Sequence, residues 1–551
     1  MSKPVAADAS RADLRALGRG SAINFVGAGL AGVAGFVMTV LVTRTQSPVQ
    51  AGVYFVATSL FVVLAGMARM GSGVGAVYWI ARLRAQGHDN LLAACVRAGL
   101  WPVAIVSVVI AVALAVAAPS LGRLLAPQQA PAVATALRQL SALFPFAVLL
   151  DVLLAATRGF GTMRPTFVVE RVLRQALQLT LVAVACLFVP RLLPLLWALA
   201  WLPTACLAWV QLRRLVRRAG RRAEASAADQ GPPEAAEDGA GVAEDNAVLG
   251  AGDLVGSSRG EPQREYSTAA YWSFCAPRGV TTLVQTALLR MDVLLVSAML
   301  GAGSAALYAA STRFLIFGQL VTQAISMAVG PQLARLLAAA PRSETNVVYR
   351  LSTAWLVLTA WPVYLVCALF APVILSVFGR SYQEGVPVTV MLALTMLFAT
   401  ACGLTDVVLT MAGRARWNLA NRTLALVVNI AVDLLLIPRW GIMGAATGWA
   451  CAIVVSNLLP VVQLRRSLGL SPWGRSTTIA LLLSGVCFGF VPGVVRVVMG
   501  ANWPAVSGAL LLGGMLYLGG LWRWREVLRL EDMLAIIRRR PRSNSPIAAG
   551  R

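Results

Sequence analysis

The chain alternates between long apolar runs and short polar connections. Most runs have about 20 residues or more, and a helix with a rise of about 1.5 Å per residue then crosses the hydrocarbon core of about 30 Å. The predicted spans are 20–43, 51–68, 91–118, 139–157, 170–189, 192–210, 271–300, 304–329, 351–378, 386–411, 417–437, 441–463, 476–497 and 505–522. The pattern predicts an all-α polytopic membrane protein with about 14 transmembrane helices.

The arginines are distributed unevenly between these connections. Short cytoplasmic connections of membrane proteins carry an excess of basic residues. The arginine-rich segments are the N-terminal tail, 82–84, 158–164, 213–222, 335–350, 414–416, 465–475 and the C-terminal tail. They alternate with connections that hold few or no arginines, such as 301–304. We therefore expect a multi-pass protein of the cell membrane with both termini in the cytoplasm, which requires an even number of spans.

Composition agrees with a membrane protein. The chain is 58% hydrophobic and 13% charged, with a mean hydropathy of +0.73. Its formal charge of +24 would suggest nucleic acid as a partner of a soluble protein. Here the basic residues lie between the apolar runs, so they indicate orientation in the bilayer instead.

Several residue types are too rare for common kinds of chemistry. Lys3 is the only lysine, so the chain has no GxxxxGK[ST] phosphate loop. His88 is the only histidine and lies in a basic connection, which excludes a histidine-rich metal site and a histidine-based hydrolase triad. The eight cysteines have no CxxC spacing. We expect no cofactor, no metal centre and no enzymatic activity.

A polar interval divides the chain into two halves. Residues 219–265 are rich in acidic and small residues, which is typical of a disordered linker. The predicted segments are a cytoplasmic amphipathic tail (1–19), a six-helix bundle (20–210), a disordered cytoplasmic linker (211–266), a second six-helix bundle (267–463), two additional helices (464–522) and a basic cytoplasmic tail (523–551).

The two halves resemble each other in sequence. The stretch 41–58 aligns without gaps on 295–312, so that Tyr54 corresponds to Tyr308 at an offset of 254. Asp151 corresponds to Asp406 at an offset of 255. Both matches join spans of the same orientation, which predicts a parallel duplication and two pseudo-symmetric bundles that enclose a central site.

Ionisable residues gather in the seventh and eighth spans. A charge at membrane depth costs at least about 2.5 to 3.5 kcal/mol, so it indicates a function or a partner. Arg278 and Asp292 lie on one helical stripe, whereas Arg290 points roughly 160° away from Asp292 because successive residues turn by about 100°. Arg290 and Arg313 lie at about equal distances from the turn at 301–302 and are expected near the midplane.

These residues suggest two interpretations. Arg278, Arg290 and Arg313 can form a cationic site for an anionic headgroup, because guanidinium groups bind phosphate oxygens in pairs and remain charged. Asp292 can instead neutralise one arginine as a structural ion pair. The first half has no such charges, since Asn24, Phe36, Met38 and Ser59 stand at the positions equivalent to Arg278, Arg290, Asp292 and Arg313.

Two equivalent carboxylates lie just before basic cytoplasmic turns. Asp151 and Asp406 can form an inner gate or bind a coupling cation, or they can hold the turns through salt bridges. Glu170 with Arg174, and Asp433 before Arg439, are interpreted as structural ion pairs.

Several short stretches resemble the polysaccharide, or O-antigen (Wzx) type, flippase family of the multidrug/oligosaccharidyl-lipid/polysaccharide (MOP) superfamily. They are Gln50-Ala51-Gly52-Val53-Tyr54, Arg290-Met291-Asp292, Ala306-Leu307-Tyr308, Gly330-Pro331-Gln332, Phe378-Gly379-Arg380-Ser381-Tyr382 and the segment 434–446 with its Pro-x-x-Gly link. The resemblance implies 14 spans in two bundles of the MATE and MurJ type. It further implies a flippase that moves a polyprenyl-diphosphate-linked glycan to the outer leaflet by alternating access.

Other functions remain open at this stage. An ion-coupled drug exporter of the same superfamily would be expected to line its cavity with carboxylates, whereas arginines are in excess here. A membrane-embedded glycosyltransferase, polymerase or ligase would need sizeable extracytoplasmic loops, and those predicted are short. A transport-dead scaffold that recruits partners through the linker is a further alternative. For a flippase, the expected partners are the polyprenyl-diphosphate-linked glycan, membrane lipids and polysaccharide assembly proteins.

Overall fold

The computed structural model describes residues 27–229 and 266–531, with the side chains of 222–229 left out. The predicted N-terminal tail (1–19), residues 230–265 of the predicted linker and residues 532–551 of the C-terminal tail lie outside this range. The described residues form helices and turns, with no strand among them.

Twelve helices in the described residues are long and apolar enough to cross a membrane, and two bent pairs raise the number to 14. The first half contains Gly27–Thr45, α2 (Pro48–Ala68), α3 (Ser72–Ala85), α4 (Leu92–Leu125), α5 (Ala130–Ser141), α6 (Phe144–Gly159), the π-helical Thr166–Leu173, α7 (Arg174–Phe188), α8 (Leu193–Leu199) and α9 (Trp201–Asp229). The bent pairs are α5 with α6 and, in the second half, α11 with α12.

The second half has the same kind of order and two further spans. It contains α10 (Thr268–Leu300), α11 (Ala302–Ser311), α12 (Leu315–Ala339), α13 (Arg342–Leu369), α14 (Ala371–Leu375), α15 (Val386–Ala401), α16 (Thr405–Met411), α17 (Ala415–Trp440), α18 (Ile442–Leu468), α19 (Arg475–Ser484), α20 (Val491–Met499) and α21 (Trp503–Arg523). The structure thus confirms the all-α polytopic fold. It also shows α9 continuing through 211–229, so this part of the predicted linker is helical.

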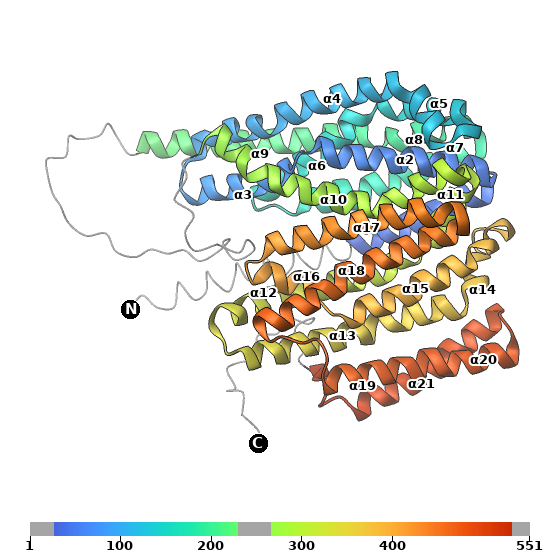
Figure 1. The fold of residues 1–551 in the computed structure, drawn as a ribbon. Coiled ribbons are helices and arrows are strands. Elements are labelled where there is room, and N and C mark those ends of the chain that lie inside the picture. Colours follow the sequence, from blue (N-terminus) through green and yellow to red (C-terminus); the bar gives the residue numbers. More distant parts are fainter. Residues whose placement is uncertain (1–26, 230–265, 532–551) are drawn as a thin grey trace.

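Figure 1 shows the helices in three groups. The first half, from α2 to α9, forms one lobe, and α12 to α18 form the other. The last helices, α19 to α21, pack on α13, where the Trp355 indole donates to the Leu528 carbonyl at 2.9 Å and the Tyr517 hydroxyl donates to the Leu358 carbonyl at 2.6 Å. The helix α10 runs between the two lobes.

The first half of α10 packs on the N-terminal lobe. The hydroxyl groups of Tyr271 and Ser72 lie 2.9 Å apart, and Tyr271 also donates to the Ser72 carbonyl at 3.0 Å. Beside them, Gly71 has a φ of +75°, and a Cβ there would lie 2.3 Å from the Cys275 carbonyl oxygen. A glycine is therefore required where the α2–α3 turn meets α10.

The other end of the molecule, at α11 and α14, joins the lobes through different groups. Arg44, at the end of the first helix, donates to the carbonyls of Ser376 and Val377, each at 2.7 Å. Phe36 of the same helix contacts Phe314 and Phe378 with ring centroids 5.3 and 5.6 Å apart. The first helix is therefore attached to the C-terminal lobe at this end.

One contact repeats in both lobes at the predicted offset. The Tyr54 hydroxyl donates to the Met38 sulfur at 3.6 Å, and the Tyr308 hydroxyl donates to Asp292 Oδ2 at 2.5 Å. Both members of each pair differ by the same offset, since 308 − 54 = 254 and 292 − 38 = 254. The same helix-to-helix contact in each half supports the internal duplication.

Candidate functional site

Two charged residues on α10 face different parts of the molecule. Arg290 lies near Tyr54 on α2. The Asp292 carboxylate, in contrast, accepts a hydrogen bond from Tyr308 on α11. This is the divergence expected for residues two positions apart on a helix. The helix α10 therefore contributes to two separate sites.

The first site is a pair of arginines next to the N-terminal lobe, which we call the arginine pair (Arg290 and Arg313). The span formed by α11 and α12 bends by 46°, and Arg313 lies at the break. Its guanidinium lies 5.6 Å from the centre of the Phe55 ring, and it is close enough to Arg290 for the two positive charges to interact. Two like charges are thus held together where α2 meets the second half.

The arginine pair has an excess of positive charge. Among the residues that the structure describes, no carboxylate forms an ion pair with Arg290 or Arg313. Arg313 Nε is buried without a hydrogen-bond acceptor. A buried guanidinium without a partner is costly, and an anionic ligand would satisfy it.

Arg278 does not join the arginine pair. It precedes Arg290 by twelve residues, which is about 18 Å along a helix. Its guanidinium lies over the Phe274 ring, 3.5 Å from the centre, and donates to the Phe274 carbonyl at 2.8 Å. The structure therefore brings two of the three predicted arginines together.

The second site is a buried acidic cluster formed by Asp292, Tyr308, Asn429 and Asp433, which we call the carboxylate cluster. The carboxyl groups of Asp292 and Asp433 lie close enough to interact electrostatically, and Asn429 donates to Asp433 Oδ2 at 3.3 Å. Asp292 is 4% exposed and Asp433 is fully buried. A Cβ at Gly448 of α18 would lie 1.9 Å from Asp433 Oδ1, so a glycine there makes room for the carboxylate.

This cluster corrects two expectations from the sequence. Neither Asp292 nor Asp433 forms an ion pair with an arginine in the part of the chain that the structure describes. Asp292 therefore does not neutralise one of the arginines, and Asp433 is not bound to Arg439. The reason is the position of each residue around its helix. Asp292 faces α11 and α17, and Asp433 faces α10 and α18.

The carboxylate cluster has the composition of a site for a small hard cation. Asp292 Oδ1, Asn429 Oδ1 and Asp433 Oδ1 are buried with no hydrogen-bond partner. Two buried carboxylates side by side repel each other unless a cation or a proton lies between them. Carboxylate and amide oxygens are the ligands that hard cations prefer.

Sequence reasoning did not assign a function to Asn429 and Asp433. The two residues are four positions apart on one span, which places both on one face of the helix. Two polar residues with this spacing at membrane depth were a usable signal. What the sequence did not show is that this face meets Asp292 on a helix far away in the chain.

Asp151 and Asp406 form ion pairs within their own lobes. Asp151 on α6 pairs with Arg69, at the end of α2, at 2.5 Å. Asp406 on α16 pairs with Arg422 on α17. The two arginines are not equivalent in the repeat, because 69 + 254 = 323 and residue 323 is Gln. Each pair joins helices of a single lobe.

The two lobes, with polar groups enclosed where they meet, define an all-α multi-pass membrane protein. No protein-family model and no curated protein matches the sequence. Solved structures do match it, and they are transporters of the MOP superfamily.

Three of these structures show how far the fold extends. The lipid II flippase MurJ in an inward closed conformation covers 92% of this chain and 100% of its own, with a TM-score of 0.64 and 10% identity. The match to an inward-facing MATE multidrug resistance transporter covers 80% of this chain and 94% of the transporter, with a TM-score of 0.60 and 13% identity. The match to the MATE multidrug transporter DinF-BH covers 82% of this chain and 95% of DinF-BH, with a TM-score of 0.57 and 14% identity. At such identities the likeness concerns the fold.

Proposed function

We propose that the protein is a flippase for a polyprenyl-diphosphate-linked glycan, moving it from the cytoplasmic to the outer leaflet by alternating access for cell-surface polysaccharide biosynthesis. The observation that carries this proposal is the arginine pair at the meeting of the lobes, with no carboxylate partner among the described residues. Two guanidinium groups offer paired donors to the oxygens of a diphosphate. The headgroup would lie between the lobes while the lipid tail stays in the bilayer.

The carboxylate cluster supports ion coupling of this transport. It lies on α10 two residues from Arg290, so a cation bound at Asp292 acts on the helix that also carries an arginine of the headgroup site. We assign this cluster to a coupling Na⁺. Asp151 and Asp406 are less suited to coupling, because each already has an arginine partner.

A drug exporter of the same superfamily is the alternative, and MATE transporters share the fold. An organic cation would need accessible carboxylates. Asp433 is fully buried and packs against Gly448, so a molecule of drug size does not reach its carboxylate. The enclosure of the carboxylates therefore favours the flippase.

The flippase proposal places the protein in the cell membrane with both termini in the cytoplasm, among membrane lipids and polysaccharide assembly proteins. The test is the sidedness of polyprenyl-diphosphate-linked saccharides in inside-out and right-side-out vesicles from depleted cells. We expect accumulation on the cytoplasmic face, which wild-type protein reverses and Arg290→Glu does not.

Arg439→Glu is the matched control, because Arg439 is an exposed arginine at the end of α17. It should restore transport like the wild type at equal protein level. Unchanged sidedness after depletion would reject the flippase and direct attention to drug efflux. Full activity of Arg290→Glu would reject the arginine pair as the headgroup site.

A further inference from the structure

The helices α10 and α17 meet along only part of their length. They pack together at Leu288 and Ala425 and at the carboxylate cluster. Before these contacts, α10 is held by the N-terminal lobe through Tyr271 and Ser72. The first turns of α17 are held by the C-terminal lobe, where Asn421 and Gln463 exchange two amide hydrogen bonds of 2.8 and 2.9 Å. The two helices therefore follow different lobes toward their N-terminal ends.

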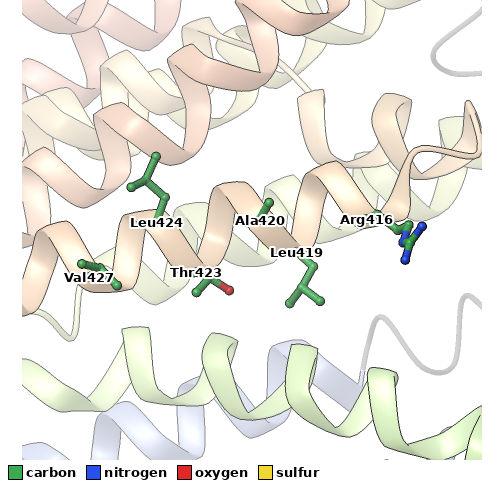
Figure 2. A pocket seen from close by; sticks show the side chains of 6 residues that line it. All are labelled: Arg416, Leu419, Ala420, Thr423, Leu424 and Val427. Atoms are coloured by element: carbon green, nitrogen blue, oxygen red, sulfur yellow. The ribbon is translucent and has the colours of Figure 1, made fainter.

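A groove of about 570 Å³ runs along α17 in this region. It is lined by Arg416, Leu419, Ala420, Thr423, Leu424 and Val427. Figure 2 shows Leu419 and Thr423 directed toward a neighbouring helix in the colour of α10. Val427 lies eleven positions after Arg416, so the groove extends about 16 Å along the helix. Its walls are almost entirely apolar.

One end of the groove carries a positive charge. Arg416 forms no hydrogen bond or ion pair with the residues that the structure describes. The next residue, Trp417, is exposed, and arginine with tryptophan is typical of the membrane interface. The predicted orientation places this end at the cytoplasmic leaflet. An apolar groove that begins at an unpaired guanidinium matches a lipid with a phosphate head and a hydrocarbon chain.

We propose that this groove, which we call the α17 groove, is the loading site for the polyprenyl-phosphate-linked substrate, with the chain along Leu419, Ala420 and Leu424 and the phosphate on Arg416. The proposal rests on the flippase function. The apolar lining of the groove suits a hydrocarbon chain, and Arg416 at one end suits a phosphate group. Since surrounding lipid is equally apolar, selectivity comes from the phosphate contact and from packing in the groove.

The α17 groove ends near the arginine pair. Its deeper end, at Val427, lies just beyond the point where Ala425 packs on Leu288, and Leu288 is two residues from Arg290. A lipid loaded here would lie beside the helix that carries the headgroup site. The headgroup would then pass from Arg416 to the arginine pair while its chain remains in contact with α10 and α17.

The test measures binding of polyprenyl diphosphate to the purified full chain in phosphatidylcholine nanodiscs by native mass spectrometry. Ala420→Trp fills the groove, and Arg416→Gln removes the charge without adding volume. We expect each to weaken binding by about tenfold or more. Leu435→Trp is the control, because Leu435 is an exposed residue of α17 outside the groove, and it should bind as the wild type does.

Three results would overturn the α17 groove as the loading site. The first is that both groove variants bind the lipid as the wild type does, and the second is that Leu435→Trp weakens binding as much as they do. The third is that an equal concentration of phosphatidylglycerol displaces the polyprenyl lipid.

The vesicle assay separates this proposal from the flippase function. If wild-type protein moves the lipid and Ala420→Trp moves it equally well, only the groove is rejected. If wild-type protein moves no lipid, the flippase function itself is rejected.

Discussion

Arg290 and Asp292 are two residues apart on one helix, yet they belong to sites of opposite charge. The arginine faces the N-terminal lobe beside Tyr54, and the carboxylate faces the interior of the C-terminal lobe beside Tyr308. A helix keeps such charges apart without any intervening residue, because its side chains radiate by about 100° per position. The proposed headgroup site and the proposed cation site can therefore share α10.

At this scale we predict that Asp433→Asn abolishes Na⁺ binding. The substitution removes one charge from a pair of buried carboxylates and leaves the volume nearly unchanged, so the protein should still fold. Wild-type protein should gain several degrees of melting temperature in NaCl relative to KCl, since ligand that binds only the folded state stabilises it. The variant should show no such gain.

Glu384→Gln is the control for this measurement, because Glu384 is exposed in the short 3-10 helix Arg380–Gly385 and its substitution removes the same charge elsewhere. It should retain the full effect of Na⁺. The assignment of the carboxylate cluster to Na⁺ is wrong if the melting temperature of wild-type protein is the same in both salts.

At the scale of elements, the turn between α2 and α3 positions α10. Gly71 combines a φ of +75° with a backbone contact to Cys275 that has no room for a side chain. We predict that Gly71→Ala destabilises the protein by roughly 2 to 4 kcal/mol, through the strained dihedral angle and the clash. Thermal unfolding in detergent measures this change.

Gly87 is a control that separates the effect of the dihedral angle from the effect of the clash. Its φ is +73°, yet a Cβ there would meet nothing within 4 Å. Gly87→Ala should therefore destabilise the protein by about 1 kcal/mol, from the dihedral angle alone. Equal losses in the two variants would contradict a tight contact between the α2–α3 turn and α10.

The sequence predicted those features of the fold and of the site that depend on residues close together in the chain. The spans and the opposite directions of Arg290 and Asp292 follow from periodicity, which is local. The break at Arg313 was not predicted, because a bend between α11 and α12 leaves the hydropathy of the span unchanged. Asp433 was misinterpreted because its nearest charge in the sequence is Arg439, whereas its neighbour in space is Asp292.

At the scale of the whole molecule, Arg44 ties the first helix to the C-terminal lobe. Its two hydrogen bonds to Ser376 and Val377 join the first helix to the turn after α14, more than 300 positions away in the sequence. Each such bond contributes about 1 kcal/mol, so losing both would shift a two-state equilibrium by roughly tenfold or more. We predict that Arg44→Ala favours a conformation in which the lobes separate at this end.

Spin labels on Thr45→Cys and Glu384→Cys, in a background without native cysteines, report this separation. Both positions are exposed at the end in question. We expect a longer distance population in Arg44→Ala and none in Arg123→Ala, an exposed arginine whose contact with Ser120 is local. Identical distance distributions would show that Arg44 does not control the opening.

The paired tyrosine contacts have a consequence for the energetics of a transport cycle. The duplication kept the donor, Tyr54 or Tyr308, and replaced the acceptor, so that a thioether stands in one repeat and a carboxylate in the other. A thioether is uncharged and accepts weakly, so the first repeat offers no counterpart to the ion site. If Na⁺ drives the cycle, its stoichiometry is then set by one repeat alone. An ion crossing the full field supplies about 2.3 kcal/mol per 100 mV.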